Sequence, residues 1–150
     1  MALRPRQNAS VDHLRGVKEF GACSPAELMQ VAALAEHLHV TAGEILTREG
    51  RIDREFFLIL SGSVSVTQKG HQVNLLGAGD FFGELAAVHS TPRNATVTAL
   101  TDMEVLIIGP RELATISEIP SFRSSLMEEM ARRQGALDTD VARTVSGASR

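Results

Sequence analysis

The sequence has little of several features that mark particular protein classes. Its only cysteine, Cys23, cannot form an internal disulfide, which favours a reducing compartment. No run approaches the roughly 18 consecutive apolar residues that a membrane span needs. The N-terminal stretch MALRPRQNAS also lacks the apolar core of a secretory signal. We therefore expect a cytoplasmic protein without a membrane partner.

Neither sign of charge is in large excess, and the common catalytic motifs are missing. The 150 residues carry a net charge of −3 and have a pI near 5.9, so bulk electrostatics do not draw the chain to DNA or RNA. A nucleophile elbow, a Walker loop and paired catalytic carboxylates are all absent from the sequence. These absences favour a protein that is not an enzyme.

The length fits one domain with a single core, which we expect to fill residues 1–150. Helices are expected over about 10–38, because the apolar residues from Val11 to Phe20 follow a helical spacing. Ser24, Pro25 and Glu27 form an N-terminal capping signature for a helix that runs to about residue 38. Further helices are expected over about 110–145.

Residues 39–109 have a different sequence pattern, in which short apolar runs alternate with glycines. The expected strands are EILTRE, FFLIL, SVSVTQ, HQVNLL, ATVTAL and MEVLII. No helix separates them, which disfavours a parallel α/β sheet. The predicted fold is mainly β with flanking helices: a β jelly-roll barrel with N-terminal helices and a C-terminal helical lid.

The stretch GDFFGELAAVHSTPRNATVTA, residues 79–99, combines residue types that suit a sugar-phosphate. A short helical turn is expected near 84–89, and its first N–H groups would form an anion site. Arg93, stiffened by Pro92, can hold two phosphate oxygens at once. Glu84 offers only acceptors, which suits the hydroxyl donors of a ribose.

The segment FGELAAVHSTPRNATVTA resembles the phosphate-binding cassette of cyclic nucleotide-binding domains. That family includes regulatory subunits of cyclic-AMP-dependent protein kinase, catabolite activator proteins and cyclic-nucleotide-gated channels. The resemblance extends from about residue 12 to about residue 132. It implies a non-catalytic sensor or regulatory module in signal transduction, whose ligand is cAMP or else cGMP, with no further cofactor and no metal.

The resemblance also implies a role for each cassette residue. Glu84 would accept from the ribose 2′-hydroxyl, Arg93 would pair with the cyclic phosphate, and Gly83 would let the backbone approach the sugar. The backbone N–H groups facing the ribose-phosphate would be those of Leu85, Ala86 and Asn94. Strand alternation places Val66, Val73 and Leu76 as walls for the base.

Two features depart from the family pattern. Asn94 stands where members commonly carry alanine, serine or threonine, and this leaves the choice of purine open. The chain has no Trp and no Tyr, so Phe122 is the aromatic residue of the C-terminal region that could cap the base. The non-aromatic candidates for that role are Leu126, Met130, Arg132 and Arg133.

Two alternatives compete with this reading. A degenerate domain could keep the fold and act only in protein interaction. A metal-dependent cupin enzyme could use His37, His39 and Glu44, although His37 is expected at the end of a helix and not in a strand. The expected partners are an effector protein or a second copy bound through the C-terminal helix. No second domain follows before Arg150, so DNA binding by this chain alone is not expected.

Overall fold

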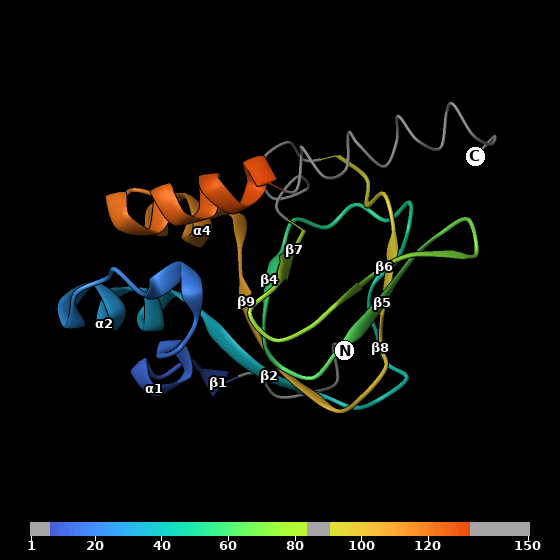
Figure 1. Cartoon of the computed structure of the whole chain (residues 1–150), viewed down its shortest axis with the longest axis horizontal. Coiled ribbons are helices and arrows are strands. Elements are labelled where there is room, and N and C mark those ends of the chain that lie inside the picture. Colours follow the sequence, from blue (N-terminus) through green and yellow to red (C-terminus); the bar gives the residue numbers. More distant parts are fainter. Residues whose placement is uncertain (1–6, 84–90, 133–150) are drawn as a thin grey trace.

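The structure, a computed structural model, describes residues 7–83 and 91–132. Its helices lie together on one side of two antiparallel sheets, and the sheet labelled β2, β9, β4 and β7 lies between the helices and the other sheet (Figure 1). This arrangement confirms the expected class, mainly β with flanking helices, and matches a jelly roll.

The expected order of elements is largely confirmed. The helical elements are α1 (Val11–Leu14), the 3₁₀ helix η1 (Lys18–Phe20), α2 (Pro25–Leu34), α4 (Pro110–Ile116) and a helix over 120–132. The strands are β1 (Gln7–Asn8), β2 (Glu36–Val40), β3 (Ile45–Thr47), β4 (Phe56–Ser61), β5 (Val64–Gln68), β6 (His71–Leu76), β7 (Phe81–Phe82), β8 (Thr96–Ala99) and β9 (Met103–Ile108). All six strands expected from the sequence are present.

The two sheets have the strand orders β1-β2-β9-β4-β7 and β3-β8-β5-β6, with every pair antiparallel. Both faces of the five-stranded sheet are buried. Phe56 and Leu58 of β4 pack against the helices, whereas Phe57 and Ile59 face the other sheet. A strand covered on both faces is apolar throughout, which explains why FFLIL and VLII show no polar alternation.

The N-terminal helical region differs from the expectation in two places. The helix expected over residues 11–20 is broken at Gly16, whose φ of +82° lies in the left-handed region. The capping box at Ser24 and Glu27 is confirmed, but α2 ends at Leu34, so the helix predicted to reach residue 38 is too long. The next segment forms β2, which pairs with both β1 and β9.

The C-terminal helices lie over the same helical core. Phe122 is 1% exposed and stacks on Phe20 with their ring centroids 5.1 Å apart. Leu126 is also buried in this core, and Met130 packs against it. Within residues 7–83 and 91–132, no helix is both long and apolar enough to cross a bilayer. The residues expected to continue the last helix, from 133 onward, lie outside the described part.

Candidate ligand-binding site

Arg93 is the one charged residue that is buried among those the structure describes, with its side chain 5% exposed. Its Nε donates to Asp53 Oδ1 at 2.6 Å, and its terminal Nη2 forms an ion pair with the same carboxylate. Nη2 also donates to the Glu55 carbonyl at 2.7 Å, and Nη1 donates to the Gly83 carbonyl at 3.4 Å. The planar guanidinium is therefore fixed in one orientation.

The backbone around Arg93 is held as firmly as its side chain. Its N–H donates to the Arg51 carbonyl at 2.8 Å, and its own carbonyl accepts from the Gly50 N–H at 2.8 Å. The guanidinium carbon lies 5.9 Å from the centre of the Phe57 ring, within the range of a cation–π contact. The loop before β8 and the loop before β4 thus jointly hold this cation in position.

Gly83 is required where it stands for two independent reasons. Its φ of +90° is one that side chains with a Cβ rarely adopt. A Cβ built on it would lie 2.6 Å from Arg93 Nη1 and 2.6 Å from the Glu55 carbonyl oxygen. The expected role of this glycine was close approach to a sugar; in the structure its missing side chain makes room for the guanidinium.

Asp53, the acidic partner of Arg93, is a residue of the candidate site that the sequence alone does not indicate. Asp53 lies 40 positions before the arginine, outside the segment that carries the motif. A buried cation needs an acidic partner, but the sequence offers no spacing rule that selects Asp53 from the other carboxylates. Asp53 also lines a cavity of about 330 Å³, together with Ile45, Leu46, Thr47, Arg48, Arg51 and Ile52.

The other predicted contacts fall in different places. Glu84, Leu85 and Ala86 lie outside the described residues, as does the helical turn expected near 84–89. Asn94 is exposed, and its carbonyl accepts from Gln68 Nε2 at 2.9 Å, which ties the end of the cassette to β5. The structure thus brings Gly83, Arg93 and Asn94 to one region.

The three predicted base walls do not share one environment. Val66 and Leu76 pack against the cluster between the two sheets. Val73 is 42% exposed and lies at the shift in register between β5 and β6, where Val66 pairs with Asn74 and Thr67 with Gln72. A bulge interrupts the alternation from which its orientation was predicted.

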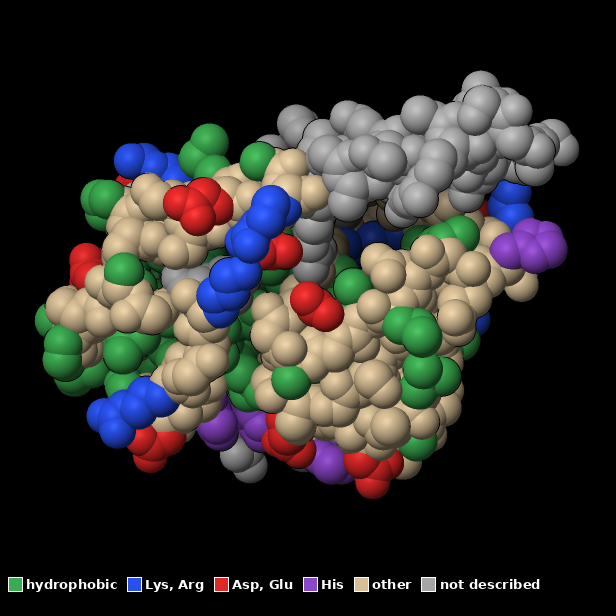
Figure 2. Space-filling view, viewed as in Figure 1, with side chains coloured by type: hydrophobic (Ala, Val, Ile, Leu, Met, Phe, Trp, Pro, Cys, Tyr) green, Lys and Arg blue, Asp and Glu red, His purple; other side chains and the backbone are tan. Residues whose placement is uncertain are grey.

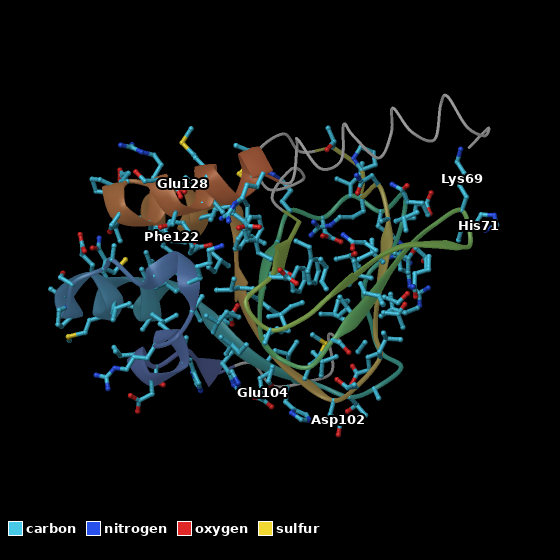
Figure 3. The ribbon with its side chains drawn as sticks, viewed as in Figure 1. Lys69, His71, Asp102, Glu104, Phe122 and Glu128 are labelled. Carbon is cyan, nitrogen blue, oxygen red and sulfur yellow. The ribbon has the colours of Figure 1, made fainter. Side chains whose placement is uncertain are left out.

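The candidates for capping the base are engaged elsewhere in this structure. Phe122, Leu126 and Met130 belong to the helical core or pack on it. Arg132 forms an ion pair with Glu129 at 2.6 Å, and Arg133 lies outside the described residues. The face of helix 120–132 that carries Phe122 points toward the N-terminal helices (Figure 3).

The metal-site alternative required His37, His39 and Glu44 to converge. His37 does lie in a strand, which corrects the expected helix end, but both histidines contact Glu104. Glu44 instead accepts from the Thr41 N–H at 2.9 Å. In the part of the chain that the structure describes, no three His, Cys, Asp or Glu side chains are grouped so as to hold a metal ion.

Comparison with known proteins identifies the family. The model of the cyclic nucleotide-binding domain matches residues 37–118. A cyclic nucleotide-gated potassium channel of Rhizobium etli is 31% identical over 117 residues, which are 77% of this chain and 33% of the channel. A cAMP-dependent protein kinase regulatory subunit of Schizosaccharomyces pombe is 35% identical over 100 residues, which are 66% of this chain and 24% of the subunit.

A solved structure shows the same arrangement of elements. A cAMP-binding acyltransferase from Mycobacterium smegmatis superposes with a TM-score of 0.75 and 26% identity, over 84% of this chain and 41% of that chain. This chain therefore spans a third or less of the two curated relatives, and under half of the acyltransferase. Because the family model matches more than half of its residues, the chain belongs to the cyclic nucleotide-binding domain family.

Proposed function

We propose that the chain binds cAMP through Arg93 and acts as a non-catalytic sensor. The proposal rests on one observation: the guanidinium of a buried arginine is held in a fixed orientation at the cassette, next to a glycine whose missing side chain leaves room for it. A guanidinium has five N–H donors, and four of them have the partners described above. A phosphate would take the remaining donor on Nη1 and compete for those now shared with Asp53.

The remaining contacts extend this proposal to the sugar and base. Glu84 would accept from the ribose 2′-hydroxyl, with the N–H groups of Leu85, Ala86 and Asn94 facing the ribose-phosphate. Val66 and Leu76 support a base lying toward the space between the sheets, because both already pack at its edge. Val73 would need a different approach to reach the base, because it is exposed.

The relatives support a regulatory role in signalling. Two of them are named as a gated channel and a regulatory subunit, and the likeness to the acyltransferase covers less than half of that enzyme. We propose that residues 1–150 form one such domain in the cytoplasm. An effector protein or a second copy would bind the outer face of helix 120–132, where Met127 is 62% exposed.

The test is calorimetric titration of the whole chain with cAMP, cGMP, 5′-AMP and adenosine. The proposal predicts saturable binding of cAMP, weaker binding of cGMP, and little or no binding of 5′-AMP and adenosine. Binding of cGMP in preference to cAMP would reassign the purine. A folded chain that binds neither cyclic nucleotide would favour the degenerate domain that acts only in protein interaction.

A further inference from the structure

The cavity of about 330 Å³ lies along β3 and the loop that follows this strand. β3 stands at the end of the strand order β3-β8-β5-β6, and it is therefore an edge strand of its sheet. Among the lining residues, Leu46 and Thr47 are buried, whereas Arg48, Arg51 and Ile52 are exposed. We call the cavity and these three exposed side chains the basic groove, because two cations and one apolar side chain form its rim.

The basic groove adjoins the candidate ligand-binding site but has different walls. Gly83, Arg93, Val66 and Leu76 do not line it. Asp53 does line it, but its carboxylate is paired with the Arg93 guanidinium, which offsets its charge. The side chains on the rim of the groove therefore have no part in the contacts proposed for a cyclic nucleotide.

A tight turn sets the spacing of the two arginines on the rim. The Arg51 N–H donates to the Arg48 carbonyl at 3.1 Å, and Gly50 between them has a φ of +85°. A four-residue turn keeps its first and last Cα atoms within about 7 Å, and a type II turn favours glycine with a positive φ at its third position. Arg48 and Arg51 are therefore neighbours on the surface.

The backbone of this turn is anchored from three directions. The Gly50 N–H donates to the Arg93 carbonyl at 2.8 Å, and the Glu49 N–H donates to Thr96 Oγ1 at 3.0 Å. From the β5–β6 hairpin, the Lys69 N–H donates to Glu49 Oε1 at 2.9 Å. Because the turn is already ordered, a partner that binds it pays little of the entropy of fixing a loop.

The two arginines of the rim have charges that no neighbour offsets. Within residues 7–83 and 91–132, neither the Arg48 nor the Arg51 side chain makes a hydrogen bond or an ion pair. The acids of the same loop point to other partners: Glu49 accepts from the Lys69 N–H, and Asp53 is paired with the buried arginine of the cassette. The rim of the groove is therefore positive, although the whole chain has a net charge of −3.

The β5–β6 hairpin adds further positive charge next to the turn. Figure 3 labels Lys69 and His71 at the tip of this hairpin. In the same view, Figure 2 shows a basic side chain and a histidine that project from the surface at this end of the molecule. Since the Lys69 backbone contacts Glu49, this cation lies beside the basic groove.

We propose that the basic groove binds an acidic segment of a partner protein that carries an apolar residue next to its carboxylates. A guanidinium can hold a carboxylate through two parallel hydrogen bonds, and the turn presents two guanidinium groups side by side. Ile52 is 71% exposed, and an apolar residue of the segment removes it from water.

A protein segment is the occupant that engages all three side chains of the rim. A free anion such as phosphate pairs with Arg48 and Arg51 but leaves Ile52 exposed. A nucleic acid is repelled by the net charge of −3. The proposal does not depend on nucleotide binding, because the rim side chains make none of the contacts proposed for the cyclic phosphate.

Fluorescence anisotropy with short labelled peptides tests the proposal on the whole chain in the absence of nucleotide. The acetylated peptide Asp-Asp-Leu-Asp-Asp should bind saturably, and its binding should weaken as the ionic strength rises. One exposed ion pair changes an equilibrium by up to about fivefold, so the neutral peptide Asn-Asn-Leu-Asn-Asn should bind at least about tenfold more weakly. Asp-Asp-Ser-Asp-Asp, which lacks the apolar residue, should bind about threefold more weakly.

Variants of the rim should reproduce these differences from the side of the protein. The double variant Arg48→Gln/Arg51→Gln should bind the acidic peptide about tenfold more weakly, and Ile52→Ser about threefold more weakly. Arg111→Gln removes an exposed arginine of α4 and is the matched control, with unchanged affinity. Arg48→Glu/Arg51→Glu should instead bind the basic peptide Lys-Lys-Leu-Lys-Lys.

The absence of saturable binding to the wild type would overturn the proposal, as would equal affinity for the acidic and neutral peptides. Undiminished affinity in Arg48→Gln/Arg51→Gln would place the peptide elsewhere. If that double variant does not fold, the two single variants and the neutral peptide decide. Displacement of the peptide by inorganic phosphate, together with unchanged affinity in Ile52→Ser, would show a site for free anions and not for a protein. A chain that binds the acidic peptide but no cyclic nucleotide would overturn the proposed function alone.

Discussion

Replacing Asp53 with alanine isolates the electrostatic role of the partner of Arg93. The variant leaves the guanidinium buried, with the carbonyls of Glu55 and Gly83 and the ring of Phe57 as its remaining described partners. Removing one member of a fully buried pair costs about 3–5 kcal/mol. Because Asp53 is 43% exposed, water already screens part of the interaction, and we expect a loss of about 2 kcal/mol. For a chain of this size the melting temperature should fall by about 4–8 °C.

A double-mutant cycle measured by urea denaturation separates this pair from other effects of the substitution. Asp53→Ala should cost about 2 kcal/mol in the wild type but under about 0.5 kcal/mol in Arg93→Leu, where no buried cation is left unpaired. Asp12→Ala breaks an exposed ion pair and serves as the control, with an expected cost of about 0–1 kcal/mol. Equal costs of Asp53→Ala in the two backgrounds would refute the reasoning.

Three further predictions concern the cassette and the last helix. Gly83→Ala should lower the free energy of unfolding, measured by urea titration, by about 1–3 kcal/mol, because alanine is strained at this φ and its Cβ clashes with Arg93. An unchanged urea midpoint would contradict this. By calorimetry, 2′-deoxy-cAMP should bind the wild type more weakly than cAMP, and the affinities of Glu84→Ala for these two ligands should differ much less. If the wild type and the variant discriminate equally between the two ligands, Glu84 has another role. Ligand should slow amide exchange in residues 120–134 as well as 83–97 if the helix moves as a lid, and protection confined to 83–97 would exclude that movement.

The strands and the cassette could be predicted because their signals are local. FFLIL and MEVLII are apolar runs bounded by turn residues, and each forms a strand of the expected extent within about one residue. The Gly-Glu and Pro-Arg pairs of the cassette lie within one short stretch of the sequence, residues 83–93. Arg93 therefore stood out before any fold was known.

The elements that sequence reasoning missed depend on partners far away in the chain. In EHLHV, Leu38 continues the helical stripe of the preceding segment, yet pairing with β9 makes it a strand. Asp53 is selected as the partner of Arg93 by the fold and not by any spacing. The side on which Val73 lies is set by a bulge opposite β5, and a rule of strict alternation along a strand does not allow for a bulge.

Binding of cAMP to Arg93→Leu, measured by calorimetry beside the wild type, tests the central claim most directly. The account predicts that the wild type binds and that Arg93→Leu loses at least about tenfold in affinity, or about 1.4 kcal/mol, with a native circular dichroism spectrum. Arg93→Lys should recover only part, because an ammonium cannot form the two-pronged contact. Arg111→Leu, which removes an exposed arginine of α4, should bind as the wild type does. Unchanged affinity in a folded Arg93→Leu variant would contradict the account.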